Sequence, residues 1–165
     1  MKQQLTIYIT LLISASVIAY IVNTLAKRIA KKTNSDNNQE SYLLFKAGLF
    51  LATGYILAGL VVPFMTMWRI VENSNPHNIL SRLTEYYTIF IFIAITLLAL
   101  CYAIGFILFN LFYTKAKLSF ALANNDLFSV TIFISLLFLT LFISKEVLPT
   151  IIDLIIPYPQ TPIYR

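Results

Sequence analysis

The sequence predicts an all-α fold, an integral membrane four-helix bundle. Hydrophobic residues make up 59% of the 165 residues and charged residues only 12%, whereas a soluble domain carries about 25% charged residues. The chain also holds four apolar runs, at 5–26, 43–65, 88–113 and 127–144. Each is close to the roughly 20 residues that a membrane-spanning helix needs. We therefore expect residues 1–165 to form a single transmembrane domain, without a soluble catalytic or sensing domain.

The first run, 5–26, predicts a membrane anchor. Lys27, Arg28, Lys31 and Lys32 follow it directly, whereas a signal peptide carries its charge before the apolar run. The polar stretch 33–41 then predicts a solvated loop between the first two helices.

The second run, 43–65, holds the small residues that we expect to organise the bundle. In lipid, helices associate through close backbone approach and van der Waals packing, which small residues permit. At helical spacing, Gly48, Ala52 and Gly59 share one face, and Gly54 and Ala58 share the adjacent face. We predict these five as helix-packing residues, in the helix upon which the others close.

The boundaries of the remaining helices are predicted from prolines, which interrupt helices, and from a carboxylate placed to cap a helix start. The second helix should end near Pro63, and residues 78–87 should form a short interfacial helix before the third run. Asp126 is well placed to cap the fourth helix, since a carboxylate favours the positive end of the helix dipole. Pro149 should break that helix, so that 151–156 form a short C-terminal interfacial helix before a proline-rich tail.

The distribution of basic residues predicts the topology. Cytoplasmic loops collect Lys and Arg, and the denser side of this chain includes the loops 27–42 and 114–126. We expect both loops in the cytoplasm and both termini outside. The same bias explains the net charge of +5, and no basic run is interleaved with aromatics, so no nucleic-acid partner is expected. The denser side carries Lys27, Arg28, Lys31, Lys32, Lys46, Lys115 and Lys117, and the other carries Lys2, Arg69, Arg82, Lys145 and Arg165.

The chain can be read as two tandem helical hairpins, 1–67 and 84–149. Both hairpins have similar spacing and a polar loop in the same place, and a shift of 82 residues aligns Thr6, Ile7 and Tyr20 with Thr88, Ile89 and Tyr102. Internal duplication would explain this. The alternative is that four apolar spans look alike because isoleucine and phenylalanine are common in them.

Polar, asparagine-bearing turns precede the second helix of each hairpin. Asn37 and Asn38 come before Lys46, Ala47 and Gly48, and Asn124 and Asn125 come before the fourth span. With the proline-rich end of the chain, this pattern resembles the YjfL-like family of small bacterial inner-membrane proteins of unknown function. The resemblance implies a multi-pass protein of four helices in the bacterial inner (cell) membrane, with no assigned activity.

The sequence contains no recognisable catalytic site. No charged residue lies near the centre of a span, and we find no paired-histidine motif, glycine-rich phosphate loop or cysteine pair. We expect no enzyme activity, no cofactor and no metal site. Four carboxylates of the outer face form a candidate ion or partner site, with ordinary interfacial charges as the alternative. They are Glu72, Glu85, Glu146 and Asp153.

The leading functional hypothesis is a non-enzymatic membrane protein in the lipid bilayer. It would be a self-associating module, and so a homo-oligomer, or an accessory subunit with a membrane-protein partner. The alternative is a small channel or carrier, formed when oligomerisation brings Ser and Thr faces together around a polar conduit. Against that alternative, Ser and Thr hydroxyls in helices can bond to the carbonyl four residues earlier and need no partner.

Overall fold

The described part of the chain is a bundle of long helices. The computed structural model describes residues 2–33, 39–74, 79–113 and 117–156, and every regular element within them is a helix. The helices that are long and apolar enough to cross a membrane confirm the predicted four-helix membrane fold. They are Leu12–Thr33, Glu40–Asn73, Ser81–Phe112 and Leu127–Asp153.

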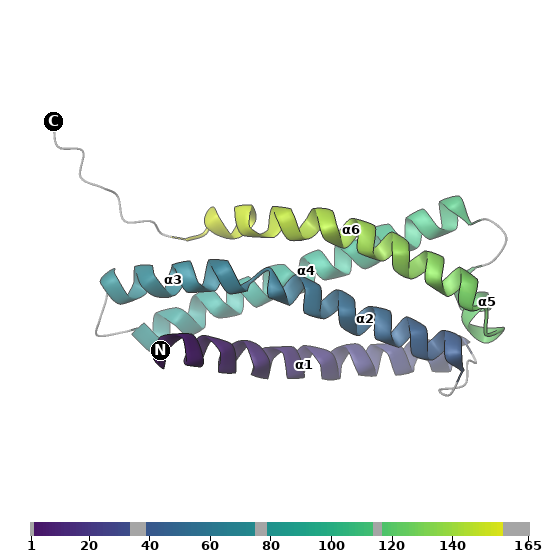
Figure 1. Ribbon diagram of the computed structural model, residues 1–165, viewed down its shortest axis with the longest axis horizontal. Helices are drawn as coiled ribbons and strands as arrows, with labels where there is room; N and C mark the ends of the chain where they lie inside the picture. Colours follow the sequence, from purple (N-terminus) through teal and green to yellow (C-terminus); the bar gives the residue numbers. More distant parts are fainter. Residues whose placement is uncertain (1, 34–38, 75–78, 114–116, 157–165) are drawn as a thin grey trace.

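Spans that are consecutive in the chain run in opposite directions (Figure 1). Helices α1 and α4 point one way, and α2, α3 and α6 point the other way. The end of α1, the start of α2 and helix α5 therefore lie together at one end of the bundle, which we call the α5 end. The helices are α1 (Lys2–Thr33), α2 (Glu40–Ala58), α3 (Val61–Ser74), α4 (Ile79–Phe112), α5 (Leu118–Ala123) and α6 (Leu127–Asp153).

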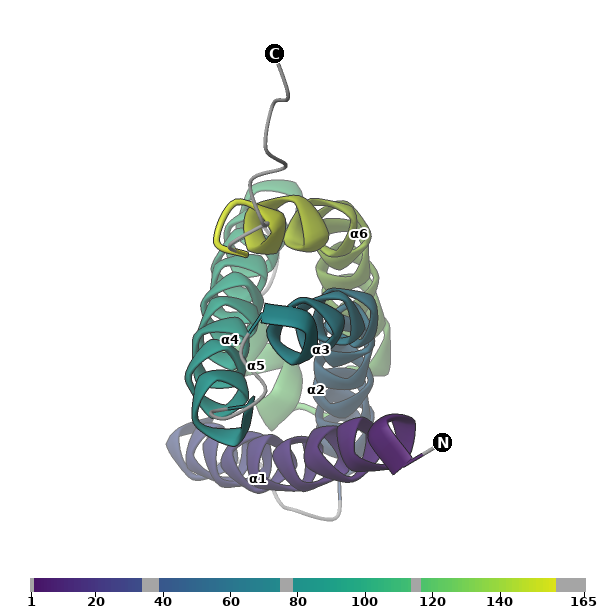
Figure 2. The same ribbon diagram turned by 90° about the vertical axis from the view of Figure 1, so that its left-hand side faces the viewer.

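Helix α2 packs against α1, α4, α5 and α6. Viewed along the bundle, α1 covers one side and α6 the opposite side (Figure 2). Helix α4 begins beside α1, where the hydroxyl of Tyr87 donates a hydrogen bond to the carbonyl oxygen of Thr10 at 3.1 Å. It then diverges from α1 toward α6 (Figure 1). This divergence determines where the bundle opens.

The second span is interrupted, and Pro63 explains the position of the break. A proline ring clashes with the carbonyl four residues earlier and has no N–H to donate to it. For Pro63 that residue is Gly59, where α2 ends with tight bonds from Gly59 N–H to Ile56 and from Leu60 N–H to Leu57, both 3.0 Å. Pro63 itself lies in the first turn of α3, where a missing N–H costs little. The single helix predicted over 43–65 is therefore two helices.

Two predicted breaks do not occur. The short interfacial helix expected over 78–87 is, from Ile79 onward, the first part of α4. Helix α6 continues through Pro149 to Asp153, so residues 151–153 are its last turn and not a separate C-terminal helix. Proline in a helix interior removes one backbone bond and does not always end the helix, since neighbouring helices can hold the segment in place. Leu148 and Ile152, on either side of Pro149, are fully buried and supply that support.

A tight turn between α5 and α6 caps two helices at once. The prediction that Asp126 caps the fourth helix is confirmed, because its carboxylate accepts hydrogen bonds from the N–H groups of Phe128 and Ser129. The Ser129 hydroxyl also donates to this carboxylate. These bonds hold the pKa of Asp126 below its ordinary value, and the bond from the Ser129 hydroxyl has the largest effect.

The same turn caps α2 from a distance. Gln39, the residue before α2, makes no side-chain cap bond. Instead the amide oxygen of Asn125 accepts from the Ser41 N–H at 2.9 Å, and the Ser41 hydroxyl donates to the Leu122 carbonyl at 3.4 Å. Asn125 has a positive φ of 54°, a left-handed conformation that asparagine tolerates better than most residues. The start of α2 is thus fixed to the start of α6.

Loss of the Asn125 cap should weaken the bundle measurably. Asn125→Gly keeps the left-handed backbone and removes the hydrogen-bond acceptor, so we expect a loss of about 1 kcal/mol in the free energy of unfolding. Asn125→Ala should cost more, because alanine adds backbone strain. Thermal unfolding in mild detergent measures both. Asn124→Gly is the matched control, since Asn124 is exposed and its side chain bonds only to Phe120 of its own helix. Equal stability of the Asn125→Gly variant and the parent would contradict the role of this cap.

Candidate functional site

The small residues of the second span lie on two faces with different surroundings. Gly48 and Ala52 are buried and Gly59 is half-buried, whereas Gly54 and Ala58 are exposed. A Cβ atom added at Gly48 would lie 2.8 Å from Cγ1 of Ile134 on α6. One added at Gly54 would have no heavy atom within 4 Å. Within the chain, therefore, Gly48 and Ala52 serve helix packing, and Gly54 and Ala58 face outward.

Gly59 lies close to α6. Its added Cβ would meet Leu148 Cδ2 at 3.2 Å and Lys145 Cγ at 3.5 Å. Lys145 in turn places its ammonium 4.3 Å from the centre of the Tyr55 ring on α2, within the range of a cation–π contact. This end of α2 is therefore fixed to α6 by packing and by a charge on an aromatic face.

The outer-face carboxylates lie on three different helices. Glu72 lies on α3, Glu85 on α4, and Glu146 and Asp153 on α6, and all four are exposed. Across the described ranges, no three side chains of His, Cys, Asp and Glu come close enough to hold a metal ion. His77, which the sequence places nearby, lies outside the described residues. Among the described residues, the four carboxylates therefore do not make a metal-binding group.

The hydroxyl groups of the spans are mostly directed back to their own helices, as the sequence predicts. Each donates to the carbonyl oxygen four residues earlier, at 2.8 to 2.9 Å. They are Ser14, Ser16 and Thr24 on α1, Thr53 on α2, Thr96 on α4, and Thr131 and Ser135 on α6.

One polar cluster crosses between helices. The Cys101 thiol on α4 donates to the Ser144 hydroxyl on α6 at 3.0 Å. The Thr140 hydroxyl lies 3.5 Å from the Cys101 carbonyl oxygen and donates to Leu137 at 2.8 Å. Cys101 is buried and not paired with another cysteine. Interhelical bonds of this kind hold membrane helices together by about 0.6 kcal/mol each.

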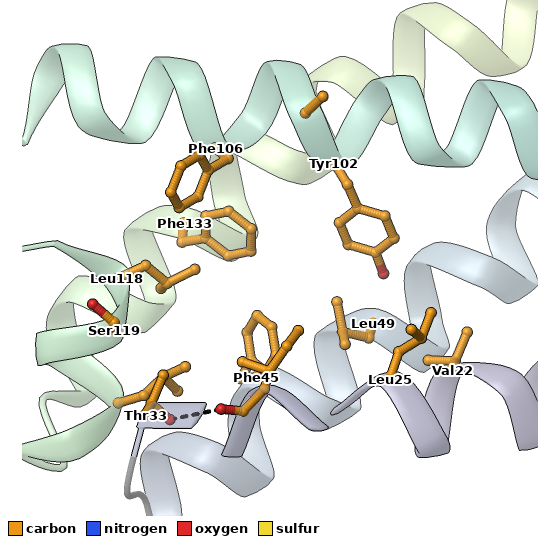
Figure 3. A pocket seen from close by; sticks show the side chains of 13 residues that line it. Val22, Leu25, Thr33, Phe45, Leu49, Tyr102, Phe106, Leu118, Ser119 and Phe133 are labelled. Carbon is orange, nitrogen blue, oxygen red and sulfur yellow. Dashed lines mark hydrogen bonds between the residues drawn. The ribbon is translucent and has the colours of Figure 1, made fainter. Parts of the chain in front are cut away.

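An apolar groove lies between α1 and α4, and we call it the α1–α4 groove. Its volume is about 480 Å³. Phe45 and Leu49 of α2 and Phe133 of α6 form its floor, and α5 closes it at the α5 end (Figure 3). Its walls are Val22, Leu25, Ile29 and Thr33 of α1, Tyr102, Ala103 and Phe106 of α4, and Leu118, Ser119 and Leu122 of α5.

The floor of the α1–α4 groove is built on packed aromatic rings, and most of the walls are apolar. The ring of Phe133 packs against Phe45 and Phe109, with centroids 5.9 and 6.0 Å apart, so three helices meet beneath the groove. Tyr102 closes the inner end, and its hydroxyl points between α1 and α2 (Figure 3) without a hydrogen-bond partner among the described residues. The only hydroxyls at the opposite end are those of Thr33 and Ser119.

Sequence reasoning did not identify this groove. Its lining residues are ordinary apolar side chains from five helices, and only the divergence of α1 from α4 makes them face a common space. The comparisons add no relative from which a site could be transferred. Searches of protein-family models, curated proteins and solved structures gave no match to this chain.

Proposed function

We propose that this chain is a non-enzymatic membrane protein that associates with copies of itself through the outward face of α2. The observation that carries the proposal is the open space at Gly54, where an added Cβ would meet no heavy atom within 4 Å apart from the adjacent residues and backbone of α2 itself. Ala58, one helical turn further, is exposed on the same face. A helix that shows small residues to lipid leaves its backbone available for close approach by another helix.

The two faces of α2 support a division of roles. Gly48 and Ala52 are already covered by α6 and the rest of the bundle. Ala47, Gly54 and Ala58 line an exposed stripe beside bulkier exposed residues, Leu43 and Leu51. Small residues between large ones form a shallow depression along a helix, into which a neighbouring helix can fit.

A channel or carrier has less support from the geometry. Such a function needs hydroxyls or charges that line a shared polar path. Hydroxyls in all four spans bond to their own backbone instead. No lysine, arginine, aspartate or glutamate lies between Lys46 and Arg69 on α2 and α3, or between Glu85 and the end of α4.

For the orientation, we propose that the α5 end faces the cytoplasm of a bacterial cell. Exposed basic residues gather there from α1 and from the residue before α5, and the positive-inside rule assigns such an end to the cytoplasmic side. They are Lys27, Arg28, Lys31, Lys32 and Lys117.

If the chain self-associates through α2, larger side chains on the outward face of α2 should weaken the oligomer. The parent protein in mild detergent should have the mass of a fixed homo-oligomer, measured by light scattering coupled to size exclusion. Gly54→Leu and Ala58→Leu should each weaken association by at least about tenfold, which corresponds to 1.4 kcal/mol. Ala99→Leu is the matched control, because Ala99 is an exposed small residue of α4 away from this face.

The outcomes separate the hypotheses. A monomeric parent at every protein concentration, or Gly54→Leu and Ala58→Leu variants with unchanged mass, would contradict self-association. A second protein that co-purifies in fixed ratio would make the chain an accessory subunit. Liposomes containing the oligomer should remain tight to ions, and a conductance increase would favour the channel.

A further inference from the structure

We propose that the α1–α4 groove binds one acyl chain of an anionic phospholipid, whose headgroup lies at the α5 end against Lys32 and Lys117. This inference concerns a different surface from the α2 face on which the proposed self-association depends. It rests on the size of the groove, on its polarity along its length and on the charges at one end.

The groove is long and apolar enough to hold a single hydrocarbon chain. Its α1 wall extends from Val22 to Thr33, which is about 16 Å at 1.5 Å per residue. The groove has a volume of about 480 Å³ along this length. An extended acyl chain is narrow enough to lie in it, and the open side between α1 and α4 admits the chain from the surrounding lipid.

The polarity of the lining matches a lipid that lies along the bundle axis. Apolar side chains such as Leu25, Leu49 and Phe106 line most of the groove, while Thr33 and Ser119 lie where α5 closes it. That end belongs to the surface at which the spans emerge from the hydrocarbon. A phospholipid has the same order, with polar ester and phosphate groups above an apolar chain.

The charges at the α5 end favour an anionic headgroup. Lys117 directly precedes Leu118 and Ser119, which both line the groove. Lys32 is three residues after Ile29 and seven after Leu25, so helical spacing places it on the groove side of α1. Lys31 falls on the opposite side by the same spacing. Both Lys32 and Lys117 are exposed, and a basic residue near a membrane surface increases affinity for anionic lipid about fivefold.

The test compares two lipids with identical chains and different headgroups. The purified protein is incubated with dioleoyl phosphatidylglycerol or dioleoyl phosphatidylcholine in detergent, and bound lipid is counted by native mass spectrometry. One phosphatidylglycerol should remain per chain, with at least about tenfold preference over phosphatidylcholine because two lysines contribute. Equal retention of the two lipids would overturn headgroup recognition.

Matched variants locate the lipid. Ala103 is an exposed residue of α4 that lines the groove, and Ala99 lies one turn earlier on α4 outside it. Ala103→Phe should remove the bound lipid, and Ala99→Phe should not. Lipid retained by Ala103→Phe would place it elsewhere and overturn the proposal. A change of oligomer mass in Ala103→Phe, without loss of lipid, would assign the groove to a helix of a second copy instead.

Charge variants test the headgroup without altering the packed interior. Lys32→Glu combined with Lys117→Glu should lower the preference for phosphatidylglycerol by at least about tenfold, while Lys31→Glu combined with Lys117→Glu should lower it less. If the two double variants behaved alike, Lys32 would not contact the headgroup and the proposed orientation would be wrong. Lipid binding and oligomer mass are separate readouts, so failure of either proposal leaves the other testable.

Discussion

Replacing Gly48 with leucine is expected to disrupt the packing of α2 against α6. Even a single added Cβ would lie 2.8 Å from Cγ1, 2.9 Å from Cδ1 and 3.2 Å from Cγ2 of Ile134. Isoleucine in a helix has one strongly preferred rotamer, so this side chain cannot easily turn away. We expect Gly48→Leu to lower the free energy of unfolding by about 3 kcal/mol or more, measured by helicity during denaturant titration in detergent micelles.

The neighbouring glycine provides the control. Gly54→Leu adds the same atoms to the same helix where no neighbouring helix lies within 4 Å, so the packing of α2 against α6 should be retained and the loss of stability should not exceed that of the weakened self-association. Gly48→Ala should also destabilise the parent and have little effect in an Ile134→Ala background, because the atoms in contact are then absent. A double-mutant cycle measures this coupling. Equal unfolding curves for Gly48→Leu and Gly54→Leu would show that α2 and α6 do not meet at Gly48.

The sequence predicts that Gly48 and Gly54 are helix-packing residues, but it does not predict which of them faces another helix of the same chain and which faces outward. A water-soluble helix shows its buried face through its apolar stripe. The second span is apolar on all sides, so the pattern of residues does not separate the face toward α6 from the face toward lipid. Helical spacing places Gly48 and Gly54 on different faces, and only the positions of the neighbouring helices decide which face is covered.

The two interior prolines show a similar limit. Pro63 and Pro149 have the same covalent effect on a helix, yet one marks a break and the other lies within α6. Leu148 and Ile152 are fully buried around Pro149, so packing holds that segment helical. Around Pro63, Gly59 instead accommodates the end of α2. Local sequence identifies the proline, but the outcome depends on contacts made by residues distant in the chain.

The cap at Asn125 shows what local reasoning can and cannot find. The role of Asp126 follows from a carboxylate placed just before an apolar run, and the structure confirms it. The bond from Ser41 to Asn125 joins residues 84 positions apart, and no sequence pattern within α2 indicates it. The α1–α4 groove likewise depends on the angle between two helices, which apolar composition does not specify.

Gly105, which sequence reasoning did not single out, should tolerate alanine and reject leucine. A Cβ added there would lie 3.5 Å from Cα and 3.7 Å from Cβ of Leu137, an ordinary van der Waals distance to the backbone of α6. Alanine therefore fits, and its helix propensity exceeds that of glycine by about 1 kcal/mol. Leucine would push α6 away from α4, and we expect a loss of about 3 kcal/mol in the free energy of unfolding.

The polar cluster beside Gly105 allows the separation of α4 and α6 to be observed directly. The Cys101 thiol donates to Ser144 and lies one helical turn from Gly105. If leucine at Gly105 moves α6 away, this buried thiol should become reactive toward a membrane-permeant maleimide in the Gly105→Leu variant and remain protected in Gly105→Ala. Protection of Cys101 in both variants, with equal stability, would mean that α4 and α6 can adapt to a leucine at Gly105. Alanine should therefore have opposite effects at the two glycines. At Gly105 an added Cβ would lie at an ordinary distance from the α6 backbone, so alanine should be tolerated. At Gly48 the side chain of Ile134 already fills the space, so alanine should destabilise the bundle.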